Sequence, residues 1–412
     1  MNRDLWTVAQ IGAREHYAIA RGLHKRGLLK KLYTDAWVSR FRSALHALPD
    51  PLYSLANRYH PDLPDRSVHH FTLQSVLSRA IFEIAGASGN EALYEHYRAA
   101  GEAFACRVRD HLLSQSPNPE RSVFFGYDTG SLEVLQALKN TDWITVVDQI
   151  DDGKVGKRIV AQEIERWPGW ATSVPVLHER YDRRRYREWQ EADIVVVNSE
   201  WSKRALLEQD VEERKIFVIP LAYEKKNYSM RERKHSVSRA EPLRILWLGS
   251  VTLRKGIQYL LSAAQELTSE PVHIDVVGSV GITEGPVSKS ASNVTFHGRV
   301  PRNQTSLFYE RSDVFVLPTL SDGFALTQVE AMAHGLPVIA TRHCGRVVNH
   351  KKNGLLIPTR SPEAIVRAIT YFLKNPSACR EMGFRAIETA KKYTIEQALQ
   401  RLRTAVAQKQ KE

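Results

Sequence analysis

The chain has 412 residues, 43% of them hydrophobic and 25% charged, which is typical of a soluble globular protein with room for two domains. The formal net charge of +12 favours an anionic partner, either a small molecule or an anionic membrane surface, and the absence of any nucleic-acid-binding motif argues against nucleic acid. No apolar run is long enough to span a bilayer, and the start MNRDLWTVAQ does not have the composition of a signal peptide. The 3 cysteines are scattered and form no disulfide framework. We therefore expect a cytoplasmic location.

The first half alternates short apolar runs with helical segments, which predicts a parallel sheet covered by helices. The first strand, Leu5 to Ile11, runs into Gly12, Ala13 and Arg14, and a helix follows from Tyr17 to Lys25. A glycine at such a strand-to-helix turn is where doubly wound sheets place ligands. Further strands are predicted at residues 122–126, 143–147, 192–199 and 216–220, with helices at residues 71–85, 91–113, 132–138 and 200–209.

The strand predicted at residues 143–147 is followed by a run of acidic and amide side chains. Asp148 and Gln149 come first, and Asp151 and Asp152 follow. Side chains at the carboxyl end of a strand point into the ligand crevice of an open α/β sheet. A solvated acidic loop is an equally good interpretation of this run.

Three segments have unusual composition, two within the first half of the chain and one at the end of that half. Residues 37–60 mix aromatic and basic side chains, as interfacial membrane segments do, although a packed helical excursion is the favoured interpretation. Residues 177–189 form a dense charge cluster, for which we expect mostly solvated helix faces. Residues 223–241 are polar, basic and aperiodic, which predicts a linker.

The second half begins with a strand that leads into a glycine and a basic pair. The strand Leu243–Leu248 precedes Gly249 and Ser250, and Arg254, Lys255 and Gly256 precede a helix from Ile257 to Leu267. Lysine offers a point charge and arginine a two-pronged fork, so this loop predicts a phosphate pocket. A solvated basic loop is the alternative, with more weight for Arg254 than for Lys255. Later strands are predicted at residues 272–277, ending at Gly278, and at residues 293–297, leading to Arg299 and Val300.

The strongest functional signal lies between residues 314 and 341. The strand Val314–Leu317 ends at Pro318, a loop follows, and a helix is predicted from Ala325 to His334, with a further strand at residues 337–341. The free amides of Phe324, Ala325 and Leu326 at the helix start would bind an anion, and the carboxylates of Asp322 and Glu330 suit hydroxyl groups. A ligand carrying both groups, such as a nucleotide-sugar, satisfies the whole arrangement. The remaining predicted elements are a strand at residues 353–357 and helices at residues 362–373, 376–392 and 395–408.

This stretch resembles the donor-binding signature of the retaining glycosyltransferases of family 4. The matching residues are Asp322, Gly323, Phe324, Glu330, Ala331, Met332, Ala333, Gly335, Pro337 and Val338, with Asp322 in place of the family's glutamate. The resemblance implies the GT-B fold, in which two Rossmann-like domains face each other across a deep cleft. The expected parts are an acceptor-side domain at residues 1–222, a linker at residues 223–242, a nucleotide-sugar-binding domain at residues 243–392, and a final helix at residues 393–412 that packs back on the first domain.

The resemblance also implies a reaction and a role for each candidate residue. It implies transfer of a sugar, with retained configuration and no metal cofactor, from a UDP-sugar or GDP-sugar to a glycan or lipid-linked acceptor. Bacterial polysaccharide or glycolipid assembly at the inner face of the membrane would suit such an enzyme. Catalytic roles fall to Lys255, Arg254, Asp322 and Glu330, with Glu330 on the ribose and Asp322 on the donor sugar. Donor contacts fall to Gly249, Ser250, Gly256, Gly278, Arg299, Val300, Gly323, Phe324, Ala325 and Leu326, and acceptor-side or sugar contacts to Gly12, Ala13, Arg14, Asp148 and Gln149.

Three other classes of function remain as alternatives. The same fold and pocket would suit a sugar-nucleotide epimerase or a phosphorylase, although the lysine that would bind pyridoxal phosphate in a phosphorylase is not identifiable. A protein could also hold a nucleotide at Glu330 without turnover. A dinucleotide oxidoreductase is disfavoured because no Gly-x-Gly-x-x-Gly motif with a downstream acid is present.

Overall fold

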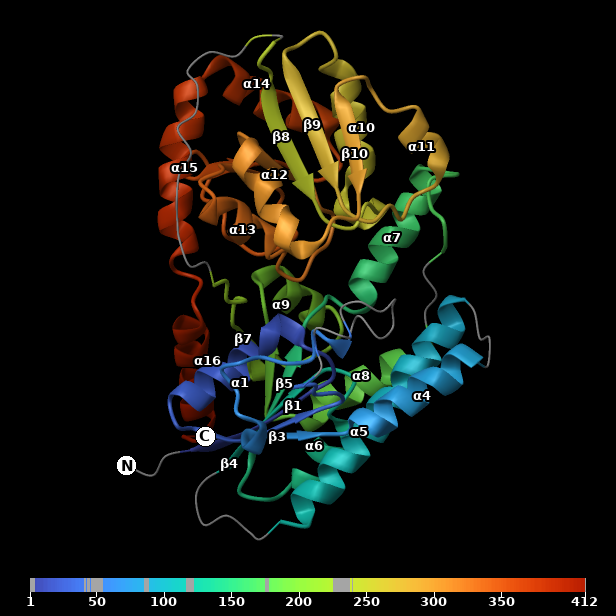
Figure 1. Cartoon of the computed structure of the whole chain (residues 1–412), viewed down its shortest axis with the longest axis vertical. Coiled ribbons are helices and arrows are strands. Elements are labelled where there is room, and N and C mark those ends of the chain that lie inside the picture. The colour runs from blue at the N-terminus through green and yellow to red at the C-terminus, as the bar shows by residue number, and fades with distance from the viewer. Residues whose placement is uncertain are drawn as a thin grey trace.

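The computed structural model describes residues 4–40, 42, 45, 55–84, 89–115, 122–174, 178–224, 238 and 240–411. It consists of two domains, each built on a parallel sheet with helices on both faces (Figure 1). The predicted architecture of two Rossmann-like domains is therefore confirmed.

The sheet of the N-terminal domain has the strand order β3-β2-β1-β4-β5-β6-β7, with every neighbouring pair parallel. The order reverses between β1 and β4, and ligands of open α/β sheets bind at such a switch point. The strands are β1 (Leu5–Gln10), β2 (Leu29–Thr34), β3 (Val68–His70), β4 (Ser122–Tyr127), β5 (Ile144–Gln149), β6 (Ile194–Val197) and β7 (Ile216–Val218). The helices are α1 (Ala18–Lys25), α4 (Thr72–Ile84), α5 (Asn90–Leu113), α6 (Leu132–Leu138), α7 (Lys154–Arg166), α8 (Glu179–Glu191) and α9 (Glu200–Leu207).

The sheet of the C-terminal domain has the order β10-β9-β8-β11-β12-β13 and is also parallel throughout. Its switch point lies between β8 and β11. The strands are β8 (Leu243–Leu248), β9 (Val272–Val277), β10 (Val294–Gly298), β11 (Val314–Leu317), β12 (Val338–Ala340) and β13 (Gly354–Leu356). The helices are the 3₁₀ turn η4 (Leu253–Lys255), α10 (Ile257–Glu266), α11 (Glu284–Ser288), α12 (Thr305–Arg311), α13 (Thr327–Ala333), α14 (Pro362–Lys374), α15 (Pro376–Ala390) and α16 (Ile395–Lys409).

The central strands are apolar on both faces because helices cover both sides of each sheet. All four residues of β11 are buried, and so are all four of β6. Alternate residues of a strand point to opposite faces, so each sheet separates two hydrophobic clusters. Continuous apolar runs of this kind are typical of parallel strands with no solvent-facing side.

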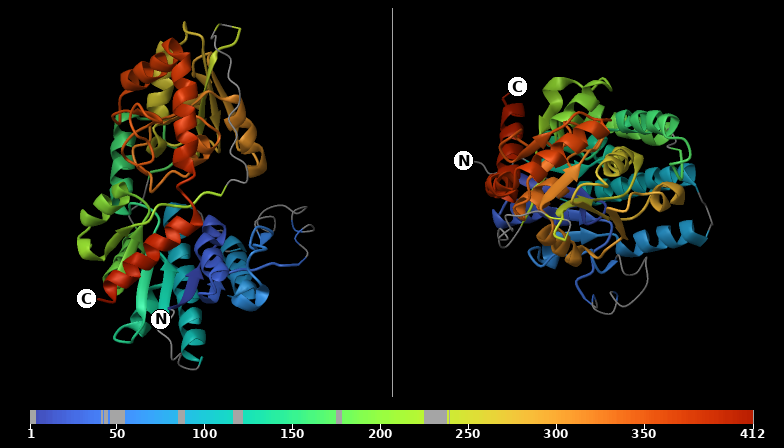
Figure 2. Two further views of the ribbon diagram at one scale, coloured as in Figure 1. Left: turned by 90° about the vertical axis from the view of Figure 1, so that its left-hand side faces the viewer. Right: turned by 90° about the horizontal axis from the view of Figure 1, so that it is seen from above.

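The last helix, α16, lies on the N-terminal domain (Figures 1 and 2). Its apolar side chains Ile395, Leu399 and Leu402 are buried in the same cluster as β1 and α1. Gly22 of α1 permits this approach, because a Cβ atom there would lie 2.4 Å from the Leu399 side chain. The chain thus crosses between the domains a second time after the linker.

Several expected boundaries differ from the structure. The first helix begins at Ala18 rather than Tyr17, because Glu15, His16 and Tyr17 have left-handed backbone angles with φ of 51°, 50° and 60°. The helix expected from Ala325 begins at Thr327, since Ala325 also has a positive φ, of 59°.

Two predicted segments fall partly outside the described residues. Of residues 37–60, the described part includes Trp37 and Ala56, which are both buried, and the choice between an interfacial segment and a helical excursion stays open. Residues 225–237 and 239 of the predicted linker are also outside that part. Among the helices that the structure describes, none has the length and apolar composition needed to cross a bilayer.

Candidate functional site

The basic loop after β8 and the loop after β11 meet at the switch point of the C-terminal sheet. The Lys255 ammonium contacts the Asp322 carboxylate, and the Arg254 guanidinium donates a 2.8 Å hydrogen bond to the Ser321 carbonyl oxygen. Gly256, with φ of 75°, allows this packing, because a Cβ atom there would lie 2.0 Å from the Pro318 carbonyl oxygen. The structure therefore places the predicted lysine, arginine and aspartate side by side.

The Lys255 ammonium is largely buried, which affects its pKa. Burial, and next the Arg254 guanidinium, lower the pKa of the Lys255 ammonium to about 7. The Asp322 carboxylate in contact with it favours the charged form. A diphosphate bound here would favour that form further, because a nearby anion stabilises a protonated amine.

Three consecutive amides provide a second positive feature beside this lysine. No described residue accepts a hydrogen bond from the N–H groups of Phe324, Ala325 and Leu326. The left-handed Ala325 turns the chain just before α13, and the Phe324 ring packs into the hydrophobic core instead of facing a ligand. The expected anion site at the helix start thus consists of backbone groups that precede α13.

Glu330, the second predicted acid, lies on α13 and is held by a buried tyrosine. The Tyr309 hydroxyl donates a 2.8 Å hydrogen bond to the Glu330 carboxylate, and the Tyr309 ring stacks on His334 with ring centroids 4.9 Å apart. Burial, and then the Glu330 carboxylate, raise the pKa of Tyr309, so the phenol stays a donor. Sequence analysis did not identify Tyr309, because a lone tyrosine on a short helix gives no signal without its partner.

Tyr309→Phe is expected to weaken nucleotide binding about tenfold, in line with the loss of one hydrogen bond to a charged group. The phenylalanine ring keeps the stack on His334, so the change isolates the hydroxyl. Calorimetric titration with a nucleotide and with its 2′,3′-dideoxy form provides the measurement. If Tyr309 orients Glu330 toward the ribose, the penalty for the dideoxy form shrinks in the variant; an undiminished penalty contradicts this role.

The loops proposed to face the nucleotide base follow β9 and β10. Gly278, just after β9, has φ of 141°, and a Cβ atom there would lie 1.7 Å from the Gly249 carbonyl oxygen, so the loop after β9 packs closely on the start of the loop after β8. Arg299 is exposed, and Val300 packs partly against the domain core. Ser250 is exposed at the same edge of the sheet.

On the N-terminal side, the loop after β1 carries the predicted acceptor-side residues. Gly12 has φ of 85° and donates its amide proton to Asp35 at 2.7 Å, and the partly exposed Ala13 follows it. Arg14 forms a 2.7 Å ion pair with Asp128, which lies at the end of β4. The loop after β1 and the end of β4 are therefore joined at the switch point of this sheet.

Asp148 and Gln149 lie differently from the expectation of a crevice loop. Both belong to β5 and are buried. Burial raises the pKa of Asp148 well above its ordinary value, with Glu15 and Asp128 adding to the effect. Gln149 accepts a 2.9 Å hydrogen bond from the Trp189 indole, so its amide supports the domain interior and is not free for a ligand.

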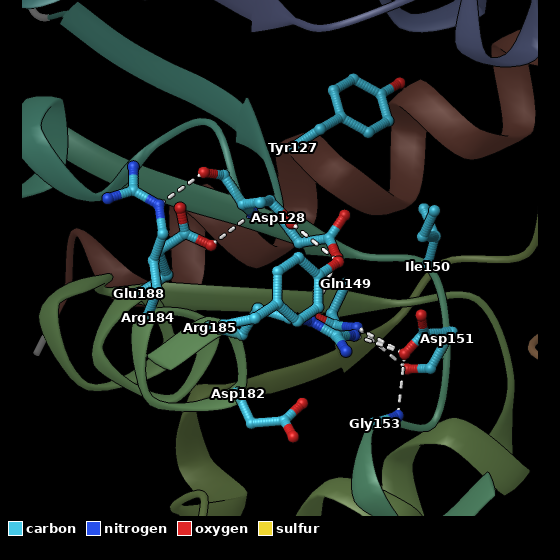
Figure 3. A network of polar contacts seen from close by, with 12 residues as sticks. Tyr127, Asp128, Gln149, Ile150, Asp151, Gly153, Asp182, Arg184, Arg185 and Glu188 are labelled. Carbon is cyan, nitrogen blue, oxygen red and sulfur yellow. Dashed lines mark hydrogen bonds and ion pairs between the residues drawn. The ribbon is translucent and has the colours of Figure 1, made fainter. Parts of the chain in front are cut away.

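The charge cluster on α8 is a solvated face only in part, since Arg180, Arg183 and Arg187 are exposed but Arg184 and Arg185 are buried. Arg185 is buried and joins Asp128 to Asp151, which in turn accepts hydrogen bonds from Gly153 and Gln149 (Figure 3). Buried charges of this kind persist only when they are paired. Arg184 likewise pairs with Glu133, and Glu188 accepts the amide protons of Thr129, Ser131 and Leu132.

The two domains touch beside the donor residues. Trp201 of α9 stacks on His343 of the C-terminal domain with ring centroids 4.0 Å apart and an interplanar angle of 15°. A Cβ atom on Gly323 would lie 2.2 Å from the Ile150 carbonyl oxygen of the opposite domain. The strained loop after β1 adds a contact between His16 and Arg302. Sequence analysis missed these contacts between the domains, because the local sequence around each residue does not indicate which distant residue it meets.

In the part of the chain that the structure describes, no three His, Cys, Asp or Glu side chains are grouped to hold a metal ion. The expectation that catalysis needs no metal stays a prediction.

The fold and the paired loops define a GT-B architecture, as solved structures with the same arrangement show. Sucrose-phosphate synthase from Thermosynechococcus elongatus superposes with a TM-score of 0.65 at 20% identity, covering 98% of this chain and 99% of that one. Anabaena Alr3699/HepE, solved in complex with UDP, superposes with a TM-score of 0.59 at 14% identity, covering 98% and 100%.

Residues 242–375 match the family model of the glycosyl transferases group 1. An uncharacterised glycosyltransferase of Haemophilus influenzae is 30% identical over 177 residues, which are 40% of this chain and 50% of that protein. The amylovoran biosynthesis glycosyltransferase AmsK of Erwinia amylovora is 26% identical over 160 residues, 34% of this chain and 37% of that protein. The chain spans about half the length of the first curated relatives that it matches.

Proposed function

We propose that the protein is a glycosyltransferase that moves a sugar from a nucleoside diphosphate donor to a hydroxyl group. The observation that carries this proposal is the cluster of charged and polar groups at the C-terminal switch point. There Lys255 contacts the Asp322 carboxylate, the amides of Phe324 to Leu326 have no acceptor among the described residues, and Glu330 lies one turn further on, in α13. Cations and amides suit the diphosphate, whereas the carboxylates suit the hydroxyls of ribose and sugar. The family of residues 242–375 and the UDP bound by HepE support the same assignment.

The chemistry follows from where charge develops. The bond between the anomeric carbon and the leaving phosphate oxygen breaks, so negative charge grows on the diphosphate and positive charge on the sugar. Preorganised positive groups at the leaving phosphate lower the barrier. Lys255, Arg254 and the amides of Phe324 to Leu326 would fill this role, so the proposal needs no metal ion.

Retention of configuration follows if the acceptor oxygen attacks the face that the phosphate leaves. The new bond forms between the anomeric carbon and the acceptor oxygen, and the acceptor proton passes to the departing phosphate oxygen. No protein base is needed in this scheme. NMR of the product's anomeric centre decides the point, and an inverted centre overturns it.

An epimerase or a phosphorylase of the same fold, and a binder without turnover, are the competing functions. A thermal-shift screen with UDP, GDP and their sugars identifies the donor, because a ligand that binds only the folded state raises its melting temperature. Release of free nucleoside diphosphate only when an acceptor is present supports a transferase. Release without acceptor, or binding without release, overturns it.

For the acceptor we propose a glycan or a lipid-linked glycan of bacterial polysaccharide or glycolipid assembly, reached at the inner membrane face. Helix α4 supports the membrane contact, since Leu73, Leu77 and Ile81 lie four residues apart on one face and are 69%, 53% and 67% exposed. The net charge of +12 suits an anionic surface. Co-sedimentation with anionic but not with neutral vesicles is expected, and no binding to either contradicts the placement.

A further inference from the structure

Helix α7 belongs to the N-terminal half of the sequence but packs on the C-terminal domain. Its apolar residues Val155 and Ile159 lie in one cluster with β8 and α10. After the helix, Ala171 forms an antiparallel bridge with Ile282, and the Trp170 carbonyl oxygen accepts the amide proton of Thr283 at 2.9 Å. Figure 1 shows α7 rising from the lower domain along the upper one. The segment from Ile159 to Thr172 is therefore attached to the C-terminal domain, whereas Lys157 and Arg158 still pair with Asp182 and Glu208 of the N-terminal domain.

A fully buried carboxylate, Glu163, lies at the centre of this contact. One of its oxygens accepts hydrogen bonds from the Gln258 amide at 2.9 Å and from the Tyr259 hydroxyl at 2.6 Å. The other accepts from the Arg360 guanidinium at 2.6 Å. All three donors belong to the C-terminal domain, and a carboxylate that loses such partners is costly to keep buried.

Gln258 connects this carboxylate to the donor loop. Its buried side-chain NH₂ group donates to Glu163 and also, at 3.0 Å, to the carbonyl oxygen of Leu253. Leu253 begins η4, the turn that contains Arg254 and Lys255. A glutamine side chain can present either its NH₂ group or its oxygen, whereas an ionised carboxylate only accepts. Glu163 thus fixes the NH₂ group toward the turn, because the opposite orientation would set two oxygens against each other.

We propose that Glu163 is a positioning residue of the donor site. Acting through Gln258, it holds the η4 turn that places the Lys255 ammonium against Asp322, where it can reach a bound diphosphate. The inference rests on the proposed function, because it assigns Lys255 to the diphosphate. It adds that Glu163, a residue of the N-terminal half, determines the affinity for the diphosphate without contacting the donor.

The test compares a nucleoside diphosphate that the wild-type protein binds with the matching nucleoside, which lacks the phosphates. Glu163→Ala is expected to weaken binding of the diphosphate about tenfold, the value of one hydrogen bond to a charged group, and to leave the nucleoside within about twofold. Glu163→Gln is expected to keep most of the affinity, since its carboxamide oxygen still accepts from Gln258. Titration calorimetry measures both ligands, and the KM of the donor is followed beside kcat.

Arg360→Ala is the matched control, because Arg360 binds the same carboxylate but not Gln258 or the turn. It is expected to lower the melting temperature and to leave the ratio of diphosphate to nucleoside affinity unchanged. Gln258→Leu removes the hydrogen bonds from Gln258 to Glu163 and to the Leu253 carbonyl oxygen. This variant keeps the proposal testable if Glu163→Ala fails to fold. It is expected to lower the ratio as Glu163→Ala does, and the double variant should lose little more, as coupled residues do.

Equal losses for both ligands, or the same change of ratio in Arg360→Ala, overturn the positioning role. A wild-type protein that binds no nucleoside diphosphate instead overturns the proposed function, and this inference with it. A failure of the positioning role is therefore seen in the variants, whereas a failure of the proposed function is seen already in the wild-type protein.

Discussion

Lys255→Ala is expected to lower kcat by ~100-fold or more, because one preorganised charge at the leaving phosphate is lost. The transition state carries more negative charge on the diphosphate than the bound donor does, so the loss should fall mainly on kcat rather than on donor binding. Steady-state kinetics with saturating donor and acceptor provide the measurement. An unchanged kcat removes Lys255 from the mechanism.

Two controls separate chemistry from folding in this experiment. Removing Lys255 leaves the Asp322 carboxylate without its cation, so thermal unfolding of the variant is followed in parallel. Lys352→Ala is the matched control, because Lys352 is exposed in the turn before β13, at the amino end of the sheet, away from the donor loops. That variant is expected to keep the wild-type kcat.

Gly323→Ala is expected to lower turnover by about 100-fold while the isolated nucleotide still binds. The added methyl group would lie 2.2 Å from the Ile150 carbonyl oxygen, and backbone on the facing domain cannot yield as a side chain can. The domains must then separate by roughly 1 Å, and a misplacement of about this size is enough for a loss of ~100-fold. The donor site of the C-terminal domain keeps its lysine, its acids and its three amides.

The measurement combines turnover with nucleotide affinity by calorimetry. Gly285→Ala serves as control, since nothing lies within 4 Å of a Cβ atom at that position. It should match the wild type in both quantities. Wild-type turnover in Gly323→Ala would show that the contact between Gly323 and Ile150 is not part of the working state.

Much of the C-terminal half was predictable because its signals are local. The strand, loop and helix that carry Asp322 and Glu330 follow one another within 25 residues, and β11 begins and ends where the apolar run does. The left-handed residues were not predictable, however. Ala325 delays α13 by two residues against the alanine-rich pattern, and Glu15 to Tyr17 delay α1 by one residue, because packing of neighbouring loops overrides local preference.

The N-terminal half was less predictable, since its charges cannot be placed without their partners. The run of arginines on α8 has the composition of a solvated helix, yet Arg184 and Arg185 are buried. Their partners Glu133 and Asp128 lie more than 50 residues earlier in the chain. Gln149 is a further example. Its partner Trp189 is 40 residues away, and the hydrogen bond from the Trp189 indole occupies the amide oxygen that was expected to face a ligand.

The sequence by itself determined the two Rossmann-like domains and the order of strand, loop and helix that carries Asp322 and Glu330. Apolar periodicity and short-range spacing are properties of neighbouring residues, so they can be read without the fold. Only the tertiary structure decided that α7 packs on the domain it does not belong to, and that Glu163 accepts from Arg360 across 197 residues. A buried carboxylate is tolerable only where distant donors converge on it, and that convergence exists in three dimensions alone.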